Sequence, residues 1–177
     1  MVKLQTRLCQ LSSGAILAAC AAFFAPGLRA QTVPGASFPA LASAGLPGGT
    51  LPDTAGKVVL VDFWASWCAP CKASFPAYSR LQSEYADRGL AIVAVSVDDT
   101  PAAYSAFVAK LKPSFVTVRD AGHALVAEVQ VPTMPTSYLM DRAGKVRYMH
   151  AGFHGDQTLR ELRREIEVLL AERAPAP

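Results

Sequence analysis

The chain has 177 residues with 17 basic and 14 acidic side chains, and its formal net charge is +3 at pH 7. Lys3, Arg7 and Arg29 supply this excess within a first segment, residues 1–30, that contains no acidic residue, so the rest of the chain is neutral overall. That balance leaves no basic surface of the kind that nucleic acids bind, and the length suits a single domain with a short tail.

Residues 1–30 have the pattern of a secretory signal peptide. A positively charged start precedes an apolar stretch over residues 11–24, and Ala30 ends a cleavage site. A lipoprotein is the alternative, because the three residues before Cys20 resemble a lipidation box, although the residues after Cys20 stay apolar. An uncleaved membrane anchor ranks last, because the apolar run is short against a span of about 20 residues. We therefore expect export to the periplasm, either as a free protein or anchored through Cys20.

The segment after the signal, residues 31–50, is rich in proline, glycine, alanine and serine, which predicts a flexible lead-in with room for one short edge strand. A folded domain is expected over 51–172, followed by a disordered tail over 173–177. Inside the domain, apolar β-branched runs predict strands, and apolar residues spaced three or four apart predict helices. The expected strands cover 58–64, 90–97, 115–119, 136–140 and 145–151, and the expected helices cover 69–87, 101–111, 122–130 and 156–170.

The most informative segment joins the first strand to the first helix. It reads Val61-Asp62-Phe63-Trp64-Ala65-Ser66-Trp67-Cys68-Ala69-Pro70-Cys71-Lys72 and changes from a strand pattern to a helical one at the first cysteine. The N-terminus of a helix carries unpaired N–H groups and a partial positive charge, which lower the pKa of a thiol placed there. Two intervening residues let both sulfurs meet across one helical turn, so the pair can alternate between dithiol and disulfide. Such a bridge closes almost no loop and adds little stability, so chemistry explains it better.

This segment closely resembles the active-site segment of thioredoxins. A second match is Met134-Pro135-Thr136, since that family faces its disulfide with a loop whose proline has a cis peptide bond. The resemblance covers roughly residues 51–170 and implies an α/β thioredoxin fold, with a central mixed sheet flanked by helices. An extra strand and helix around residues 114–130, the export signal and the segment from Tyr138 to Val146 are similar to the TlpA/ResA branch of thioredoxin-like proteins.

The resemblance implies a role for each residue of the site. Cys68 is the nucleophile, Cys71 resolves the mixed disulfide, and Asp62, in the strand beneath, handles the proton of the resolving cysteine. An apolar setting raises the pKa of such a carboxyl group, which suits it to general base work. The backbone before the proline is expected to pair with an extended segment of the substrate. The residues expected to contact substrate are Trp67, Pro70, Met134 and Pro135.

Two positions depart from the TlpA/ResA branch. Its members often carry a glutamate three residues after the second cysteine, where this chain has Ser74, and an asparagine where it has Asp62. Acid–base control therefore resembles that of thioredoxin more than that of these relatives, and a role specific to cytochromes is put in doubt. Two other interpretations remain: Asp62 as a hydrogen-bonded core residue, and Trp67 as surface packing.

The function implied is that of a periplasmic protein-disulfide reductase, an enzyme with no cofactor beyond its Cys68–Cys71 disulfide. Ala69 and Pro70 place no charge between the cysteines, which predicts a reducing couple nearer to about −270 mV than to about −120 mV. The expected partners are periplasmic proteins that contain disulfides, among them apocytochrome c or copper-site proteins. A membrane carrier of thiol reductant is expected to supply the electrons.

Three alternatives stay open at this point. The first is an oxidant or isomerase on the same fold. The second is a metal-handling module, in which the two cysteines bind copper(I) or zinc and one of the chain's histidines completes the site. None of these histidines, His123, His150 and His154, has close spacing to the cysteines, so no metal ligand is assigned. The third is an interaction domain without catalysis, whose disulfide is structural.

Overall fold

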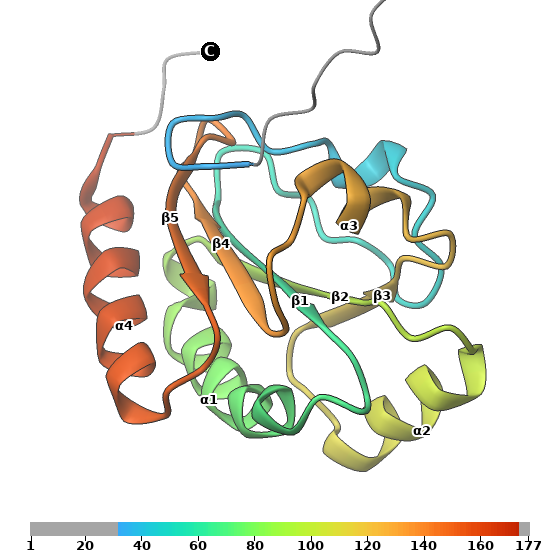
Figure 1. The fold of residues 1–177 in the computed structure, drawn as a ribbon. Coiled ribbons are helices and arrows are strands. Elements are labelled where there is room, and N and C mark those ends of the chain that lie inside the picture. Colours follow the sequence, from blue (N-terminus) through green and yellow to red (C-terminus); the bar gives the residue numbers. More distant parts are fainter. Residues whose placement is uncertain (1–31, 174–177) are drawn as a thin grey trace, which may run out of the picture.

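A computed structural model gives the fold of the chain and describes residues 32–173. The predicted signal peptide, with Cys20, and the last four residues of the predicted tail lie outside the described residues. Strands and helices follow one another in the predicted order (Figure 1). The strands are β1 (Val58–Trp64), β2 (Leu90–Ser96), β3 (Val116–Arg119), β4 (Thr136–Met140) and β5 (Val146–Ala151). The α-helices are α1 (Ala69–Tyr85), α2 (Pro101–Leu111), α3 (Ala124–Val129) and α4 (Asp156–Ala171).

The strands form a mixed sheet in the order β3-β2-β1-β4-β5, which confirms the predicted sheet type. The central strand β1 pairs in parallel with β2 and antiparallel with β4. β2 also pairs in parallel with β3, so the segments that follow β1, β2 and β3 all leave the sheet at one edge. This shared edge is where β1 leads into α1, and it therefore carries the two cysteines (Figure 1).

The side chains of β1 alternate between the two faces of the sheet, as the pleat of a strand requires. Leu60 and Trp64 face a core formed with α1, α2 and α4, whereas Val61 and Phe63 face a second core formed with α3. Asp62 belongs by this alternation to the first set. Its carboxyl group therefore points toward the face that α1 covers.

The first helix ends earlier than its apolar spacing predicts. Instead of reaching residue 87, α1 ends at Tyr85, and a 3-10 turn over Ala86–Arg88 follows it. Gly89 then adopts a φ of 101°, a left-handed conformation that costs glycine little. This turn directs the chain into β2.

The short third helix is also shorter than predicted. The pattern suggests a helix over 122–130, but α3 covers only Ala124–Val129. The preceding residues form a turn in which the N–H of His123 donates to the carbonyl of Asp120 at 3.1 Å. The glycine and the polar residues before Ala124 therefore form a turn that precedes α3 and are not part of the helix.

Residues 32–50, expected to be a flexible lead-in, lie against the sheet. Phe38, Leu41 and Leu46 pack on the second core, opposite α1. The N–H of Gly35 donates to the carbonyl of Val146 at 2.7 Å, which ties the segment to β5. Prolines and glycines separate these apolar residues, so they show neither a helical nor a strand period. For that reason the sequence pattern did not reveal the packing.

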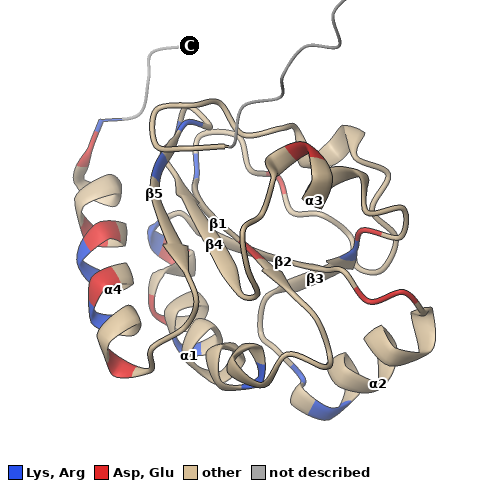
Figure 2. Cartoon of the chain, in the orientation of Figure 1, with Lys and Arg blue, Asp and Glu red and all other residues tan. Residues whose placement is uncertain are grey.

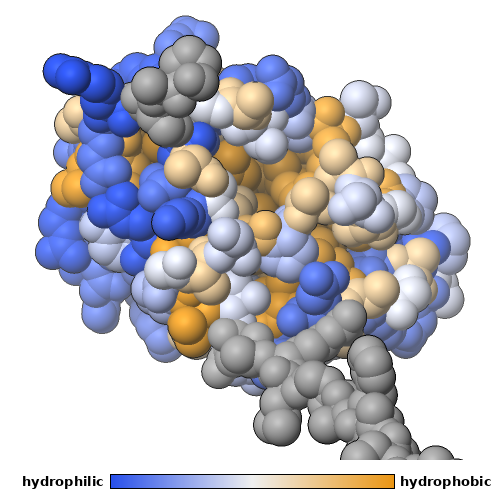
Figure 3. All heavy atoms as spheres, turned by 90° about the horizontal axis from the view of Figure 1, so that it is seen from above, coloured by the Kyte–Doolittle hydropathy of each residue, from blue (hydrophilic) through white to orange (hydrophobic). Residues whose placement is uncertain are grey.

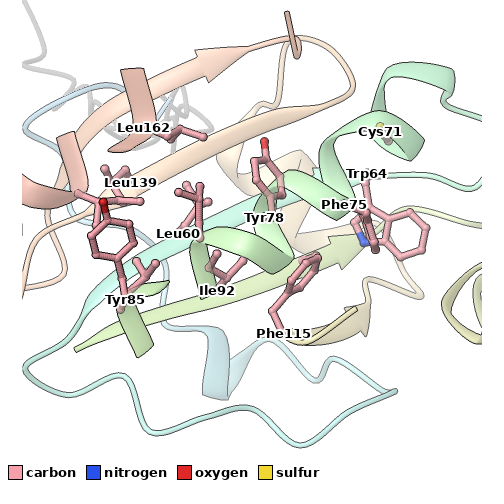
Figure 4. Packing of buried hydrophobic residues seen from close by; sticks show 14 of the residues in the cluster. Leu60, Trp64, Cys71, Phe75, Tyr78, Tyr85, Ile92, Phe115, Leu139 and Leu162 are labelled. Atoms are coloured by element: carbon pink, nitrogen blue, oxygen red, sulfur yellow. The ribbon is translucent and has the colours of Figure 1, made fainter. Parts of the chain in front are cut away.

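Aromatic rings fill the core beneath the cysteines. Trp64, at the end of β1, is fully buried, and its ring centroid lies 4.4 Å from that of Phe107 and 4.9 Å from that of Phe75. Figure 4 shows Trp64 and Phe75 next to Cys71 at the start of α1. This packing gives the active-site turn a rigid base.

The two tryptophans of the active-site segment should therefore differ sharply in their effect on stability. We expect Trp64→Ala to lower the free energy of unfolding by about 3–5 kcal/mol, because it leaves a large cavity in the core. Trp67 is 68% exposed, so Trp67→Ala serves as the matched control and should cost less than about 1 kcal/mol. Urea denaturation of the oxidised protein measures both values, and equal losses for the two variants would contradict the packing described.

The surface combines charged helices with an apolar area at one end (Figure 2 and Figure 3). Acidic and basic residues are interspersed along α4 (Figure 2), although Glu165 among them is buried. Figure 3 views the end of the molecule away from the cysteines and shows apolar residues in the middle of this face, with polar residues around them. Within residues 32–173, no helix combines the length and the apolar character needed to cross a membrane.

Candidate active site

Cys68 occupies the N-cap position of α1, at the point where the chain leaves β1. Its Sγ accepts a hydrogen bond from the N–H of Cys71 at 3.2 Å, and the two cysteines form a disulfide with their Cα atoms 5.3 Å apart. Pro70 lies in the first turn of the helix, where the missing N–H of a proline leaves no bond unmade. The structure thus shows the oxidised state, with Cys68 at the positive end of the helix as predicted.

The two cysteines differ in their access to solvent. Cys71 is fully buried, whereas Cys68 is 4% exposed and directly follows the exposed Trp67. Pro70 is also exposed beside the pair. Cys68 is therefore the more accessible of the two sulfurs, and Cys71 has no exposed surface.

Asp62 lies on the strand beneath this helix and is fully buried. Its Oδ1 accepts a hydrogen bond from the hydroxyl of Tyr78 at 3.3 Å, and its Oδ2 has no partner among the described residues. Ser74, also buried, donates its hydroxyl to the carbonyl of Cys71 at 3.0 Å. Cys71, Ser74 and Tyr78 follow one another at spacings of three and four, so one face of α1 turns all three toward the sheet.

This environment changes the ionisation of both acids. Burial raises the pKa of Asp62 well above its usual value, and the hydrogen bond from Tyr78 only partly opposes this rise. Burial, followed by the charge of Asp62, also raises the pKa of Tyr78. A carboxyl group held in this way keeps its proton at a higher pH than an exposed aspartate, so it can exchange a proton with a nearby thiol.

The raised pKa predicts how stability depends on pH. The folded chain holds the Asp62 proton more tightly than the unfolded chain does. The contribution of this protonated carboxyl group to the free energy of unfolding is therefore full below about pH 3.9, and it is lost as the pH rises through the folded pKa of Asp62. We expect Asp62→Asn, which cannot ionise, to exceed the wild type by about 2 kcal/mol at pH 8 and to match it closely at pH 4. Urea denaturation at the two pH values checks this, and a difference that does not grow with pH would count against it.

The loop that contains Met134 and Pro135 reaches the same edge of the sheet. The Met134–Pro135 peptide bond is cis, as the resemblance implies. Thr136, the first residue of β4, pairs with Phe63 near the end of β1. Residues just before Thr136 therefore lie beside the residues that follow Phe63. Met134 is half-buried and packs against the core that contains both cysteines, while Pro135 is buried.

The backbone of Met134 suits pairing with another chain. Among the described residues, its N–H and carbonyl take part in no backbone hydrogen bond and no strand pairing. On the far side, the carbonyl of Pro135 is occupied by the N–H of Gly152 at 2.7 Å, which ties the loop to the end of β5. The loop is thus tied to the end of β5, while the backbone of Met134 has no backbone hydrogen-bond partner among the described residues.

The structure adds Tyr78 to the residues expected from the sequence. Its aromatic ring fits the apolar stripe of α1, which concealed the role of its hydroxyl. The signal that could have revealed it is the spacing from Cys71 through Ser74 to Tyr78, which puts two hydroxyl groups on the buried face. Only the placement of Asp62 on the facing side of β1 gives the hydroxyl of Tyr78 an acid to bind.

Two of the histidines considered for the metal alternative have other neighbours. The Nε2 atom of His123 is 3.2 Å from the carbonyl oxygen of Val97, and that of His150 is 2.6 Å from Oε2 of Glu165. Within residues 32–173, no group of three or more histidine, cysteine or acidic residues is placed to hold a metal ion. The structure therefore does not bring a histidine to the cysteines as that alternative requires.

Comparison with known proteins places this site in a family. A family model described as Redoxin matches residues 31–166. The chain belongs to the Redoxin family. Thiol-disulfide oxidoreductase ResA of a Bacillus cereus strain is 35% identical over 96 residues, which cover 54% of this chain and 56% of the relative. Thioredoxin-like protein YneN of Bacillus subtilis is 34% identical over 122 residues, which cover 67% of this chain and 69% of the relative.

A solved structure agrees with this membership. A crystal structure described as a thiol:disulfide interchange protein DsbE from Chlorobium tepidum shares 37% identity and a TM-score of 0.65 with the Redoxin chain, over 67% of this chain and 84% of that one. The α/β thioredoxin fold and the resemblance to ResA-type proteins are thereby confirmed. The aligned part spans little more than half the length of the curated ResA relatives, at 56%.

Proposed function

We propose that this Redoxin chain is a thiol-disulfide oxidoreductase that reduces disulfides in partner proteins. The observation that carries the proposal is the Cys68–Cys71 disulfide at the start of α1, above a buried acid, Asp62, whose pKa burial raises. A disulfide of two neighbouring cysteines beside a proton acceptor has the parts that a dithiol–disulfide cycle needs.

The reaction begins with the reduced protein. The Cys68 thiolate attacks one sulfur of a partner disulfide, a bond forms between Cys68 and that sulfur, and the second partner sulfur leaves as a thiolate. Asp62 takes the proton of Cys71, and the Cys71 thiolate attacks Sγ of Cys68. The Cys68–Cys71 disulfide forms and the partner's first sulfur leaves as a thiolate. The partner has gained two electrons, and its two thiolates take up the proton held by Asp62 and one from the solvent. The two sulfurs carry the electrons, so the proposal needs no cofactor.

The surface around Cys68 suits a protein substrate. Trp67 is exposed beside the nucleophile, Pro70 is exposed within the helix turn, and the Met134–Pro135 loop ends at the same edge. An extended partner segment pairs with the backbone of Met134 and so brings its disulfide to Cys68. Trp67 covers the mixed disulfide while it persists.

The direction of electron flow follows from the residues between the cysteines. A positive charge there would stabilise the Cys68 thiolate and make the reduced form too stable to give up electrons. Ala69 and Pro70 carry no charge, so the couple is a reductant. Return to the dithiol then requires an external thiol donor, which we assign to a membrane carrier of thiol reductant.

The location and partners follow from the first 30 residues. We propose that the signal pattern directs the chain to the periplasm, where its partners are exported proteins with disulfides. Apocytochrome c and copper-site proteins are members of that class. Ser74 in place of the branch's glutamate favours a general reductant over one dedicated to cytochromes.

Reduction of insulin tests the proposed activity. Insulin disulfides, with dithiothreitol as the electron source, give a precipitate of free B chain when reduced. We expect the purified chain to accelerate precipitation at least about tenfold over dithiothreitol alone. The Cys68→Ser, Cys71→Ser double variant is the control and should give no acceleration, and a wild-type rate equal to that of the double variant would refute the proposal.

A further inference from the structure

A second buried acid, Asp98, lies beside the active-site turn and takes no part in the exchange described above. It follows β2 and is 2% exposed. Its Oδ1 accepts hydrogen bonds from the backbone N–H of Ser66 at 3.0 Å and from the hydroxyl of Ser66 at 2.7 Å. Its Oδ2 accepts the hydroxyl of Ser96 at 2.8 Å. Ser66 lies two residues before Cys68, so this acid holds the chain immediately ahead of the nucleophile.

Asp98 is itself fixed by the two neighbouring strands. Its N–H donates to the hydroxyl of Ser96, the last residue of β2, at 3.0 Å. Arg119, the last residue of β3, donates from Nη1 to the carbonyl of Asp98 at 3.3 Å. The adjacent Val97 donates its N–H to the carbonyl of Trp64 at 2.9 Å, which joins this loop to the end of β1. The carboxylate is therefore a rigid acceptor and not a mobile surface group.

The turn that Asp98 holds has few other supports. Between β1 and α1 the chain has left the sheet and has not yet entered the helix, so its N–H groups need partners from elsewhere. Cys68 donates its N–H to the carbonyl of Ala65 at 3.1 Å, within the turn itself. The two groups of Ser66 bind Asp98, and this is the contact that fixes the turn to the sheet edge.

We propose that Asp98 is a positioning residue for the exchange reaction, because its hold on Ser66 sets the turn that presents Cys68 at the N-terminus of α1. The inference rests on the proposed function of Cys68 as a nucleophile. It extends that function to a residue in the loop that follows the neighbouring strand β2. Ser66, two residues before Cys68, and the buried Asp98, which follows the parallel strand β2, together fix the position of the active-site turn.

A purely electrostatic role would have the opposite signature. The negative charge of Asp98 near a thiolate disfavours it, so removal of the charge alone would ease ionisation of Cys68. Loss of the hold on Ser66 instead loosens the alignment of Cys68 with the helix N-terminus and makes ionisation harder. The two roles therefore shift the pH dependence of Cys68 reactivity in opposite directions.

Alkylation of Cys68 by iodoacetamide across a pH series separates these roles. The full chain is used in reduced form, and peptide mass spectrometry follows Cys68 alone. We expect Asp98→Asn to move the pH midpoint of alkylation up by about half a unit and to lower the rate at pH 7 about threefold. In the amide an NH₂ donor replaces Oδ2, so the hydrogen bonds that Oδ2 accepts from the N–H of Ser66 at 3.2 Å and from the hydroxyl of Ser96 at 2.8 Å are both lost.

Asp120→Asn is the matched control, because Asp120 is equally buried and follows the next strand, but binds the N–H groups of Ala124 and Val126 in α3. Its midpoint should equal that of the wild type. A midpoint for Asp98→Asn that is unchanged or lower overturns the proposal. If that variant does not fold by circular dichroism, Ser66→Ala, which keeps the charge, decides by the same criterion. Alkylation needs no protein substrate, so a failed insulin assay would leave this result intact.

Discussion

Replacing Cys71 with serine should convert the protein from a catalyst into a trap for its substrates. Without the buried thiol, nothing within the site attacks Sγ of Cys68, so the mixed disulfide with the partner persists. We expect insulin reduction to fall by about 10³-fold or more and disulfide-linked adducts to accumulate. Cys68→Ser should lose activity to the same extent and form no adduct. Non-reducing electrophoresis with and without a reductant distinguishes the two variants.

The chain offers a matched control for this prediction. Cys9→Ser with Cys20→Ser makes the same chemical change in the predicted signal segment and should leave turnover unchanged. Adducts formed equally by Cys68→Ser and Cys71→Ser would contradict the assignment of nucleophile and resolving thiol. Turnover that survives in Cys71→Ser would contradict it as well.

Loss of the acid beneath the pair should slow the second step and spare the first. In Asp62→Asn no base accepts the proton of Cys71, so release of the mixed disulfide should slow by about 10²-fold at pH 7. Attack by Cys68 on the partner should change less than about threefold, because Cys68 lies at the helix N-terminus and not against Asp62. The defect should shrink as the pH rises, since Cys71 then ionises without help. Rapid-quench measurement of mixed-disulfide decay against pH gives both rates.

Asp120→Asn again supplies the comparison, as a buried acid on the same sheet edge that binds α3 instead of facing α1. It should leave both steps within about twofold of the wild type. If Asp62→Asn slowed attack and release equally at every pH, the carboxyl group would support the fold of the site without moving a proton. The proposed role for Asp62 would then be wrong.

Most of the fold could be predicted because its signals are local. The residues that predict β1, α2 and α4 each lie close together in the sequence. At the start of α2, the hydroxyl of Thr100 accepts a hydrogen bond from the N–H of Ala103 at 3.2 Å, which is the contact of an N-cap residue. The turn before β2 and the start of α3 differed, because glycine and polar residues next to a helix fit both a turn and a helix end.

The supporting contacts of the site could not be predicted in the same way. Ser66 and Asp98 are separated by 32 positions in the chain and meet only because β1 and β2 pair in parallel. Asp62 and Tyr78 meet only because the pleat of β1 turns residue 62 toward α1. The sequence did predict that the Met134–Pro135 loop lies beside the cysteines. That prediction came from the family resemblance, because the spacing of these residues in the chain does not indicate it.

The reduction potential of the Cys68–Cys71 couple shows whether the protein reduces partner disulfides or oxidises partner thiols. The purified protein is equilibrated with dithiothreitol buffers of graded ratio, and the fraction of dithiol is read after acid quenching and alkylation. A reductant should give a value near about −270 mV, low enough to reduce partner disulfides with electrons from a thiol carrier. A value near about −120 mV would contradict the proposed direction of electron flow, because such a couple takes electrons from partner thiols and makes the protein an oxidant.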